Sequence, residues 1–250
     1  AIGNISQNPG NEPLPVRISE DSIALIKKFP FVVSVTPTTF KNALLKTENE
    51  NEGILVKGID SSYNFGFIAS HMINGKLPDL KKSEISKEIL ISKILSDKMN
   101  LKCGDKVSLY FLTKRIVYDS TLKTEIEKSE QRSRRLYVCG IFNTNLTDFD
   151  ERLGMVDLRH LRHVNNWDSV TTGNYEIRVN NFASVDDNLK ELKNFFDYTF
   201  NVYSVKEIYA NVFIWLDKLD VNGIIIVILM IAVATINMIT ALLILILERT

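Results

Sequence analysis

Apolar residues recur at helical spacing near the start of this chain. Ile23, Ile26 and Phe29 follow Ser19, a residue type that favours the N-cap of a helix, and Pro30 ends the pattern. We therefore predict a short amphipathic helix over residues 19–29, with its apolar stripe facing a core.

The same pattern returns much later in the chain. A second helix is predicted from residue 184 by four apolar residues spaced three or four positions apart: Val185, Leu189, Leu192 and Phe196. Short runs rich in β-branched residues predict strands. These strands are expected at residues 31–36, 53–58, 88–91, 106–112, 136–142, 174–179 and 200–205. A further short helix is expected at residues 92–99.

One helix-strand unit therefore lies near each end of the charged part of the chain. This arrangement predicts an α+β domain in which a split β-α-β unit is interrupted by a β-rich insert. The expected segments are 1–60 and 170–205 for the two halves, 61–169 for the insert, and 206–222 for an amphipathic linking helix. Two independent α/β pieces are the alternative that the sequence leaves open.

No charged residue interrupts positions 223–247. A helix of this length extends on the order of 37 Å, enough to cross a hydrocarbon layer of about 30 Å. A buried helix of a soluble domain rarely stays apolar on all faces for so long. We therefore predict a transmembrane helix over residues 223–247. Ala234, Asn237 and Ala241 place small or polar groups at helical spacing, which predicts packing against another membrane helix.

Residues 114–135 are strongly polar and lie between two predicted strands, so we expect a long hairpin with a charged tip. Such a tip is either a solvated loop or a docking site for a partner. The basic candidates for partner binding are Lys114, Arg115, Lys123, Lys128, Arg132, Arg134 and Arg135.

Other chemistry is sparse. The formal net charge is zero, so no basic excess points to nucleic acid. Cys103 and Cys139 fit either a disulfide or two small buried side chains. His160 and His163 have the i, i+3 spacing of metal ligands but lack a third ligand nearby, so we expect them on a solvated helix face. The carboxylates of residues 148–151 are likewise expected at the surface. No nucleotide-binding, zinc-protease or nucleophile-elbow motif is present, so no catalytic residue, metal or cofactor is predicted.

Several stretches nevertheless resemble one family, the FtsX/MacB/LolC-type permeases of ABC transporters. Residues 88–95 (EILISKIL) and 101–107 (LKCGDKV) are similar to one conserved segment of these permeases. Residues 53–60 (GILVKGID) and 136–142 (LYVCGIF) are similar to two of their strands. The last 17 residues, 234–250 (ATINMITALLILILERT), are similar to the second of their four membrane spans. Residues 148–152 and 156–158 look closest to the lipoprotein-releasing LolC/LolE branch.

The resemblance implies a periplasmic α+β domain, made of a porter-like part and an inserted sabre-like part, on a bacterial inner membrane. It implies a non-catalytic permease, with ATP bound by a separate ATPase subunit and a second permease copy or paralogue as partner. In the LolC/LolE branch the cargo is lipoprotein, and the hairpin of the insert recruits a periplasmic lipoprotein chaperone.

Other functions remain open at this point. Within the same family, the chain also fits a MacB-like efflux protein or an FtsX-like mechanotransmitter that activates cell-wall hydrolases. From other classes, a single-pass receptor ectodomain predicts no further spans and no ATPase partner. A membrane-tethered enzyme is disfavoured by the lack of a nucleophile, metal or cofactor motif.

Overall fold

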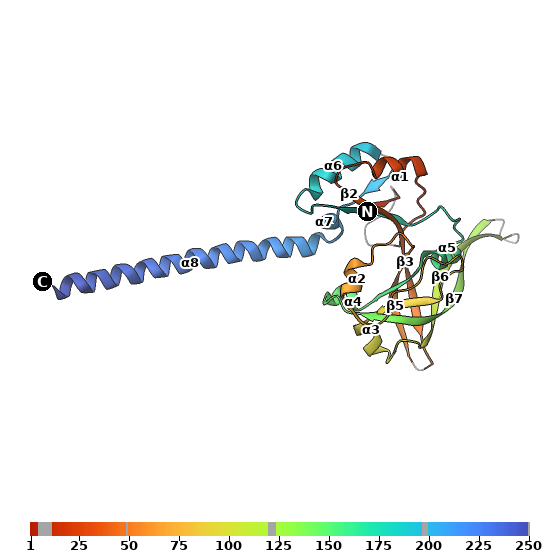
Figure 1. Ribbon diagram of the computed structural model, residues 1–250, viewed down its shortest axis with the longest axis horizontal. Helices are drawn as coiled ribbons and strands as arrows, with labels where there is room; N and C mark the ends of the chain where they lie inside the picture. Colours follow the sequence, from red (N-terminus) through yellow and green to blue (C-terminus); the bar gives the residue numbers. More distant parts are fainter. Residues whose placement is uncertain (5–11, 49, 120–123, 197–199, 250) are drawn as a thin grey trace. The chain divides into compact units, whose positions relative to one another are not determined.

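The computed structural model describes residues 1–4, 12–48, 50–119, 124–196 and 200–249. The chain divides into two compact units, a mixed α+β domain at Ala1–Tyr203 and a helical unit at Ser204–Thr250. The strands of the domain follow the order β10-β1-β9-β2-β3-β8-β5-β7-β4, and β6 joins β2 and β7. Figure 1 labels several of these strands and the helices.

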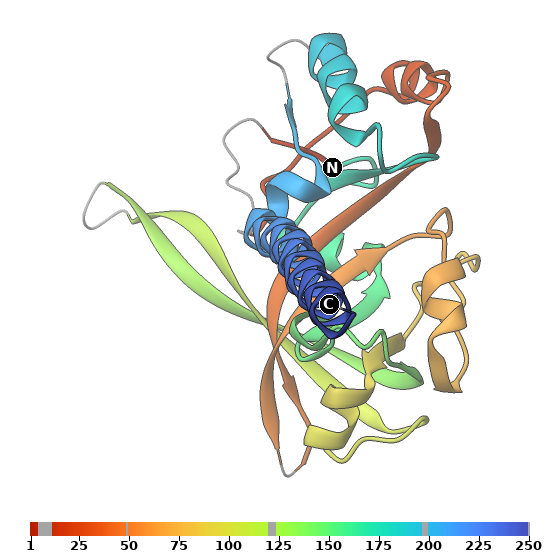
Figure 2. The ribbon, with the colours of Figure 1, turned by 90° about the vertical axis from the view of Figure 1, so that its left-hand side faces the viewer.

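The first part of the domain is a small sheet covered by two helices, which we call the sheet lobe. It contains β1 (Ile2–Gly3), β9 (Asn174–Val179), β10 (Asn201–Val202) and the first half of β2 (Val32–Lys46). The helices α1 (Glu20–Ile26) and α6 (Val185–Phe196) lie side by side over it (Figure 2). Their apolar residues share a core with the strands: Ile2, Ile26, Val35, Tyr175, Leu192, Phe196 and Val202.

The second part is a closed ring of six strands, which we call the barrel. Pairings join β2 to β3, β3 to β8, β8 to β5, β5 to β7, β7 to β6, and β6 back to β2. The strands are β3 (Asn51–Ile59), β5 (Glu88–Ser92), β6 (Lys106–Asp119), β7 (Thr124–Phe142) and β8 (Leu153–Asp157), besides β2. Alternate residues point inward, as strand geometry requires. They form the main core: Ala43, Leu45, Ile54, Val56, Ile89, Ile91, Val107, Leu109, Phe111, Leu136, Val138 and Val156.

Short helices complete the barrel. Leu95 of α3 (Lys93–Lys98) and Leu161 of α5 (Leu158–Asn165) belong to the same core. At Gly58 of β3, an added Cβ would lie 2.9 Å from Leu161 Cδ1, so the absence of a side chain lets α5 pack closely. A smaller apolar cluster lies beside α2 (Gly66–Ser70), β4 (Met72–Gly75) and α4 (Thr147–Asp150).

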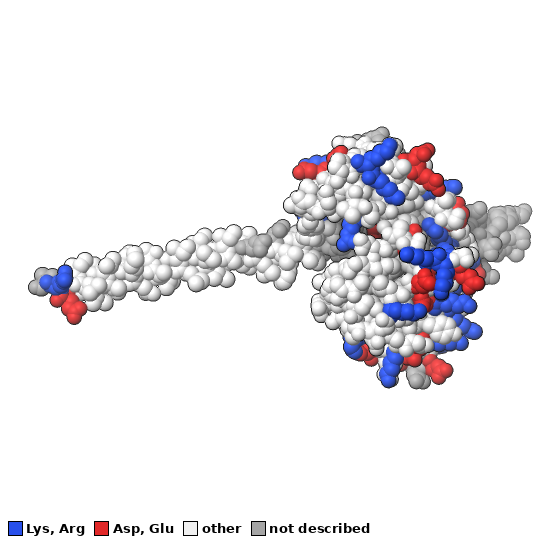
Figure 3. All heavy atoms as spheres, in the orientation of Figure 1, with Lys and Arg blue, Asp and Glu red and all other residues white. Residues whose placement is uncertain are grey.

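The helical unit contains a short helix and a long one. Helix α7 (Val205–Ile208) begins with a capping box, in which the Ser204 and Glu207 side chains each accept a hydrogen bond from the other residue's backbone N–H. Helix α8 (Ala210–Glu248) then runs without a break for 39 residues. By length and composition it is able to span a membrane, and Figure 3 shows uncharged atoms over most of its length.

The local predictions are largely confirmed. The Ser19 side chain caps α1, the stripe of α6 packs inward from Leu189 onward, and a strand lies in each of the seven predicted segments. The strand predicted at 200–205 is wrong in length, because β10 is only Asn201–Val202 and α7 begins at Val205. The predicted strand at 31–36 is wrong in length, because β2 continues to Lys46. The linking helix and the membrane span are one helix from Ala210. The subdivision at residues 60, 169 and 205 stays a prediction.

Candidate functional site

Helix α8 carries three polar residues in its apolar part, and two of them form hydrogen bonds within the helix. Thr235 Oγ1 donates to Ile231 O at 2.8 Å, and Thr240 Oγ1 donates to Ile236 O at 2.9 Å. These bonds to the preceding turn need no other helix.

Asn237 differs from both threonines. Its side chain is exposed and forms no hydrogen bond within the described part of the chain. An amide without a partner in hydrocarbon costs several kcal/mol. Ala234 and Ala241 lie three and four positions away and leave room for close approach. Residues 234, 237 and 241 lie on one side of α8, and packing of this stripe against a second helix stays a prediction.

The predicted hairpin is present as two paired strands. The register of β6 and β7 runs from Lys106 opposite Tyr137 to Asp119 opposite Thr124. In this register Arg115 lies opposite Lys128. For Lys114, Arg115 and Lys128 only the backbone is described, and Lys123 lies outside the described residues.

Arg132 anchors the base of the hairpin to α5. Its guanidinium donates to His163 O at 2.9 Å, to Val164 O at 3.0 Å and to Asn166 Oδ1 at 2.6 Å. These acceptors lie at the C-terminal end of α5, where carbonyls lack helical partners and a cation is favoured. The contact to Glu130 at 3.2 Å completes the arrangement.

The other two basic candidates at the base have different environments. Arg134 is half-buried, and burial together with nearby Arg132 lowers the pKa of its guanidinium. Arg135 is exposed to solvent. The structure therefore gives Arg132 a structural contact with α5, and partner binding by the basic candidates stays a prediction.

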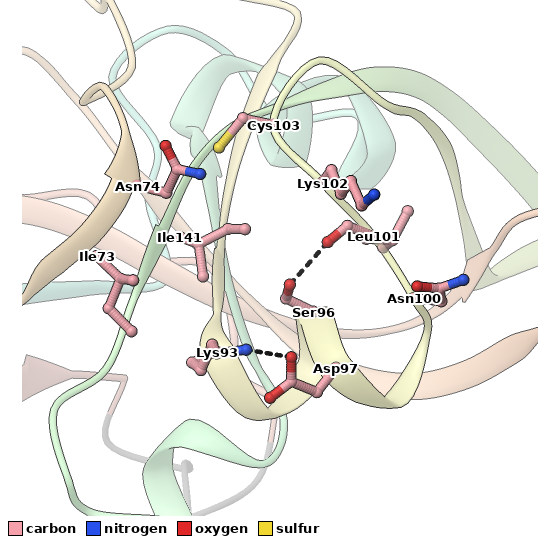
Figure 4. Close-up of a pocket in the computed structure, with 10 residues that line it drawn as sticks. All are labelled: Ile73, Asn74, Lys93, Ser96, Asp97, Asn100, Leu101, Lys102, Cys103 and Ile141. Atoms are coloured by element: carbon pink, nitrogen blue, oxygen red, sulfur yellow. Dashed lines mark hydrogen bonds and ion pairs between the residues drawn. The ribbon is translucent and has the colours of Figure 1, made fainter.

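A groove of about 580 Å³ lies on the barrel, and part of its lining comes from the segments 88–95, 101–107 and 136–142 described above. It is lined by Ile73 and Asn74 of β4, by Lys93, Ser96 and Asp97 of α3, by the turn 100–103 and by Ile141 (Figure 4). Ser96 Oγ donates to Leu101 O at 2.7 Å, and Lys93 pairs with Asp97. Sequence reasoning missed it because three distant segments form it, and its lining contains no histidine that would serve as a base.

The cysteines and histidines do not form a reactive centre. Both thiols are free, and burial raises the pKa of Cys139 to about 12. His160 is buried, so its expected position on a solvated face is wrong, whereas His163 is exposed. His160 Nε2 donates to Ser86 O at 2.8 Å, and burial lowers its pKa. Within the described ranges, no group of three or more residues able to ligate a metal is found.

The carboxylates also have structural roles. Asp150 is fully buried, which corrects the surface position expected for this residue, whereas Glu151 is exposed as expected. It accepts bonds from Thr144 N and Oγ1, both at 2.8 Å. Asp157 is buried too; burial opposes its ionisation, but bonds from Arg159 and from the Ser86 N–H hold its pKa below the usual range.

Comparison with known proteins gives two solved structures of interest. No family model and no curated protein matches the chain. The extracellular domain of the noncanonic ABC-type transporter YknZ from Gram-positive bacteria is 14% identical, with a TM-score of 0.47 over 80% of this chain and 94% of that one. The periplasmic region of MacB from Actinobacillus actinomycetemcomitans is 13% identical, with a TM-score of 0.48 over 79% and 84%. At these values the likeness assigns no function.

Proposed function

We propose that this chain is the extracytoplasmic domain and one membrane helix of a non-catalytic permease subunit of an ABC transporter. A partner ATPase would bind and hydrolyse ATP, and the permease would convert that cycle into movement outside the membrane. The motif resemblance in residues 53–60, 88–107, 136–142 and 234–250 supports this proposal.

Asn237 is the observation that carries the proposal. A lone membrane anchor has no use for an amide in its apolar part, whereas a helix bundle supplies a partner for it. The two alanines beside Asn237 lower the steric barrier to such a contact. The rival reading, a receptor ectodomain on a single anchor, leaves the amide facing lipid.

Cysteine cross-linking in native membranes tests the proposal. In the full-length gene product, with Cys103 and Cys139 replaced, Ala234→Cys and Ala241→Cys each form disulfides with cysteines introduced along other spans of the permease. Ile239→Cys, which lies on the opposite side of α8, is the matched control. Equal cross-linking at all three positions, or no other span in the reading frame, would contradict the proposal.

The finer proposal concerns the cargo. We propose that the complex extracts lipoproteins from the outer leaflet of a bacterial inner membrane, and that the distal hairpin contacts the cargo or a periplasmic lipoprotein chaperone. The length and polarity of residues 114–135 support this role, because long projecting loops are common docking sites for partners.

A shortened hairpin tests that role without disturbing Arg132. Residues 116–127 are replaced by Asn-Gly, a two-residue turn that suits hairpins and joins Arg115 to Lys128. We expect lipoprotein transfer to be lost while ATPase activity of the complex is retained. Unchanged transfer would contradict the hairpin role but leave the permease proposal intact.

A further inference from the structure

Strand β2 belongs to both parts of the domain and passes between them without a loop. Its residues 32–38 pair with β9, ending with Thr38 opposite Asn174. Its residues 39–46 pair with β3, starting with Thr39 opposite Gly58. The partner of β2 therefore changes between two adjacent residues, and the strand can be followed from the sheet lobe into the barrel in Figure 2.

Hydrogen bonding is incomplete at this crossing. Pro37 has no N–H to donate. Thr38 and Thr39 are both fully buried, and neither Oγ1 has a hydrogen-bond partner among the residues that the structure describes. A buried hydroxyl without a partner disfavours the arrangement that contains it, by roughly tenfold in population. A second arrangement that gave these hydroxyls hydrogen-bond partners would therefore lower the free energy of the domain at this crossing.

Two buried lysines lie on either side of the crossing. Lys41 Nζ is 2.9 Å from Glu12 Oε2, and Lys57 Nζ is 2.8 Å from Glu176 Oε1. Each lysine side chain is only 9% exposed, whereas the carboxylates are 39% and 34% exposed.

The two ion pairs have the same polarity. Both lysines come from barrel strands, at positions 41 of β2 and 57 of β3. Glu176 belongs to β9, and Glu12 precedes Val16, whose backbone bridges to Thr172 next to β9. The barrel thus supplies both cations. Glu176 attracts β9 of the sheet lobe toward the barrel, and Glu12, which also accepts a hydrogen bond from Asn42 N of β2 at 2.9 Å, attaches the segment before Val16 to it.

The partners also have alternatives when they separate. Lys57 Nζ lies 5.3 Å from the centroid of the Phe40 ring and 5.0 Å from that of Tyr63, and both rings belong to the barrel side. Cation–π attraction to these rings would stabilise the Lys57 ammonium after it separates from Glu176. The partly exposed carboxylates would gain water. Separation is therefore less costly than for an ordinary buried ion pair.

We propose that residues 37–39 form a hinge between the sheet lobe and the barrel, and that the pairs Lys41–Glu12 and Lys57–Glu176 are the latch that holds the observed arrangement. This device does not depend on the proposed transport function, since it rests on contacts inside the domain alone.

Pulsed electron–electron double resonance, which measures the distance between two spin labels, tests the hinge on the full chain in detergent. Spin labels are placed at Lys190→Cys on α6 and Lys106→Cys on β6, with Cys103→Ser and Cys139→Ala. In the latch variant Glu12→Gln/Glu176→Gln, we expect a second population of label-to-label distances. This population should be at least ten times larger than in the parent protein. Adding Thr38→Val/Thr39→Val should reduce this population again by roughly tenfold per hydroxyl.

Two further variants make the result decisive. Asp97→Asn breaks the exposed pair with Lys93 inside α3 and should leave the parent distribution unchanged. If the simpler variant unfolds, both members of each latch pair are replaced: Lys41→Met/Glu12→Gln/Lys57→Met/Glu176→Gln. This variant leaves no buried charge at either pair, so we expect it to fold. A single unchanged distance in the folded latch variants would overturn the proposal.

Discussion

Arg132 was a candidate for partner binding, but in the structure its side chain stabilises the fold. Its guanidinium satisfies two carbonyls at the end of α5 and the side chain of Asn166. Bonds to a charged donor are stronger than neutral ones. Removing the donor takes this partner from Val164 O and Asn166 Oδ1, whereas His163 O keeps the Asn166 N–H at 3.4 Å.

We therefore expect Arg132→Met to lower the free energy of unfolding by about 1–3 kcal/mol. Urea denaturation followed by circular dichroism measures this change. Arg135→Met, at an exposed position three residues along the same strand, is the control and should stay within about 0.5 kcal/mol of the parent. Equal effects of the two changes would contradict the role of Arg132.

His160 predicts a pH dependence of stability. Burial lowers its folded-state pKa below 6.5, so the unfolded chain binds more protons there. Stability from this group is therefore present above pH 6.5 and is lost as the pH falls from 6.5 toward the folded-state pKa. Melting temperature measured from pH 7.5 to 5 should fall less steeply for His160→Gln than for the parent. His163→Gln, exposed on the same helix, should follow the parent; a parent-like slope in His160→Gln would refute the assignment.

At the scale of elements, α8 combines satisfied and unsatisfied polar groups on one helix. We predict that Asn237→Leu weakens association of the membrane helices by about 1 kcal/mol, because the interhelical hydrogen bond is lost. Thr235→Val and Thr240→Val should have smaller effects, since their hydroxyls bond within the helix. Retention of the multisubunit complex in increasing detergent measures the difference. Greater loss in the threonine variants than in Asn237→Leu would count against the stripe.

The elements themselves were predictable where their signal is local. The apolar stripe of α6 and the Ser19 cap of α1 depend on residues close together in the sequence, so local patterns predict them. The length of β2 was missed because its second half is stabilised by pairing with β3 and β6 rather than by its own pattern. Closure of the barrel likewise depends on contacts between distant segments, such as Leu44 opposite Tyr110.

The candidate site was predictable in part for the same reason. The uncharged length of α8 and the stripe of Asn237 follow directly from composition and helical spacing. The buried positions of Lys41 and Lys57 do not, because a lysine in a strand is ordinarily solvated and only the tertiary fold brings Glu12 and Glu176 to it. His160 and Asp150 were predicted at the surface because the residues next to them in the sequence give no sign that their side chains are buried.

At the scale of the whole molecule, the domain has its own cores and needs nothing from the helical unit to bury them. The three apolar clusters lie entirely within Ala1–Tyr203. We expect residues 1–203 to be soluble without detergent and to unfold cooperatively, with a free energy of unfolding equal to that of the same domain in the full chain. Calorimetry on both proteins checks this expectation, and an unfolded or aggregated 1–203 would contradict the division into two units.

We propose above that this chain belongs to a permease that works with a separate ATPase. The most direct measurement is purification of the full-length gene product from its native membranes in mild detergent, with every copurifying protein identified by mass spectrometry. The account predicts an ABC-type ATPase subunit in stoichiometric amount, lost on washing more readily in Asn237→Leu than in Thr235→Val. A pure, single-span protein with no ATPase subunit would contradict it.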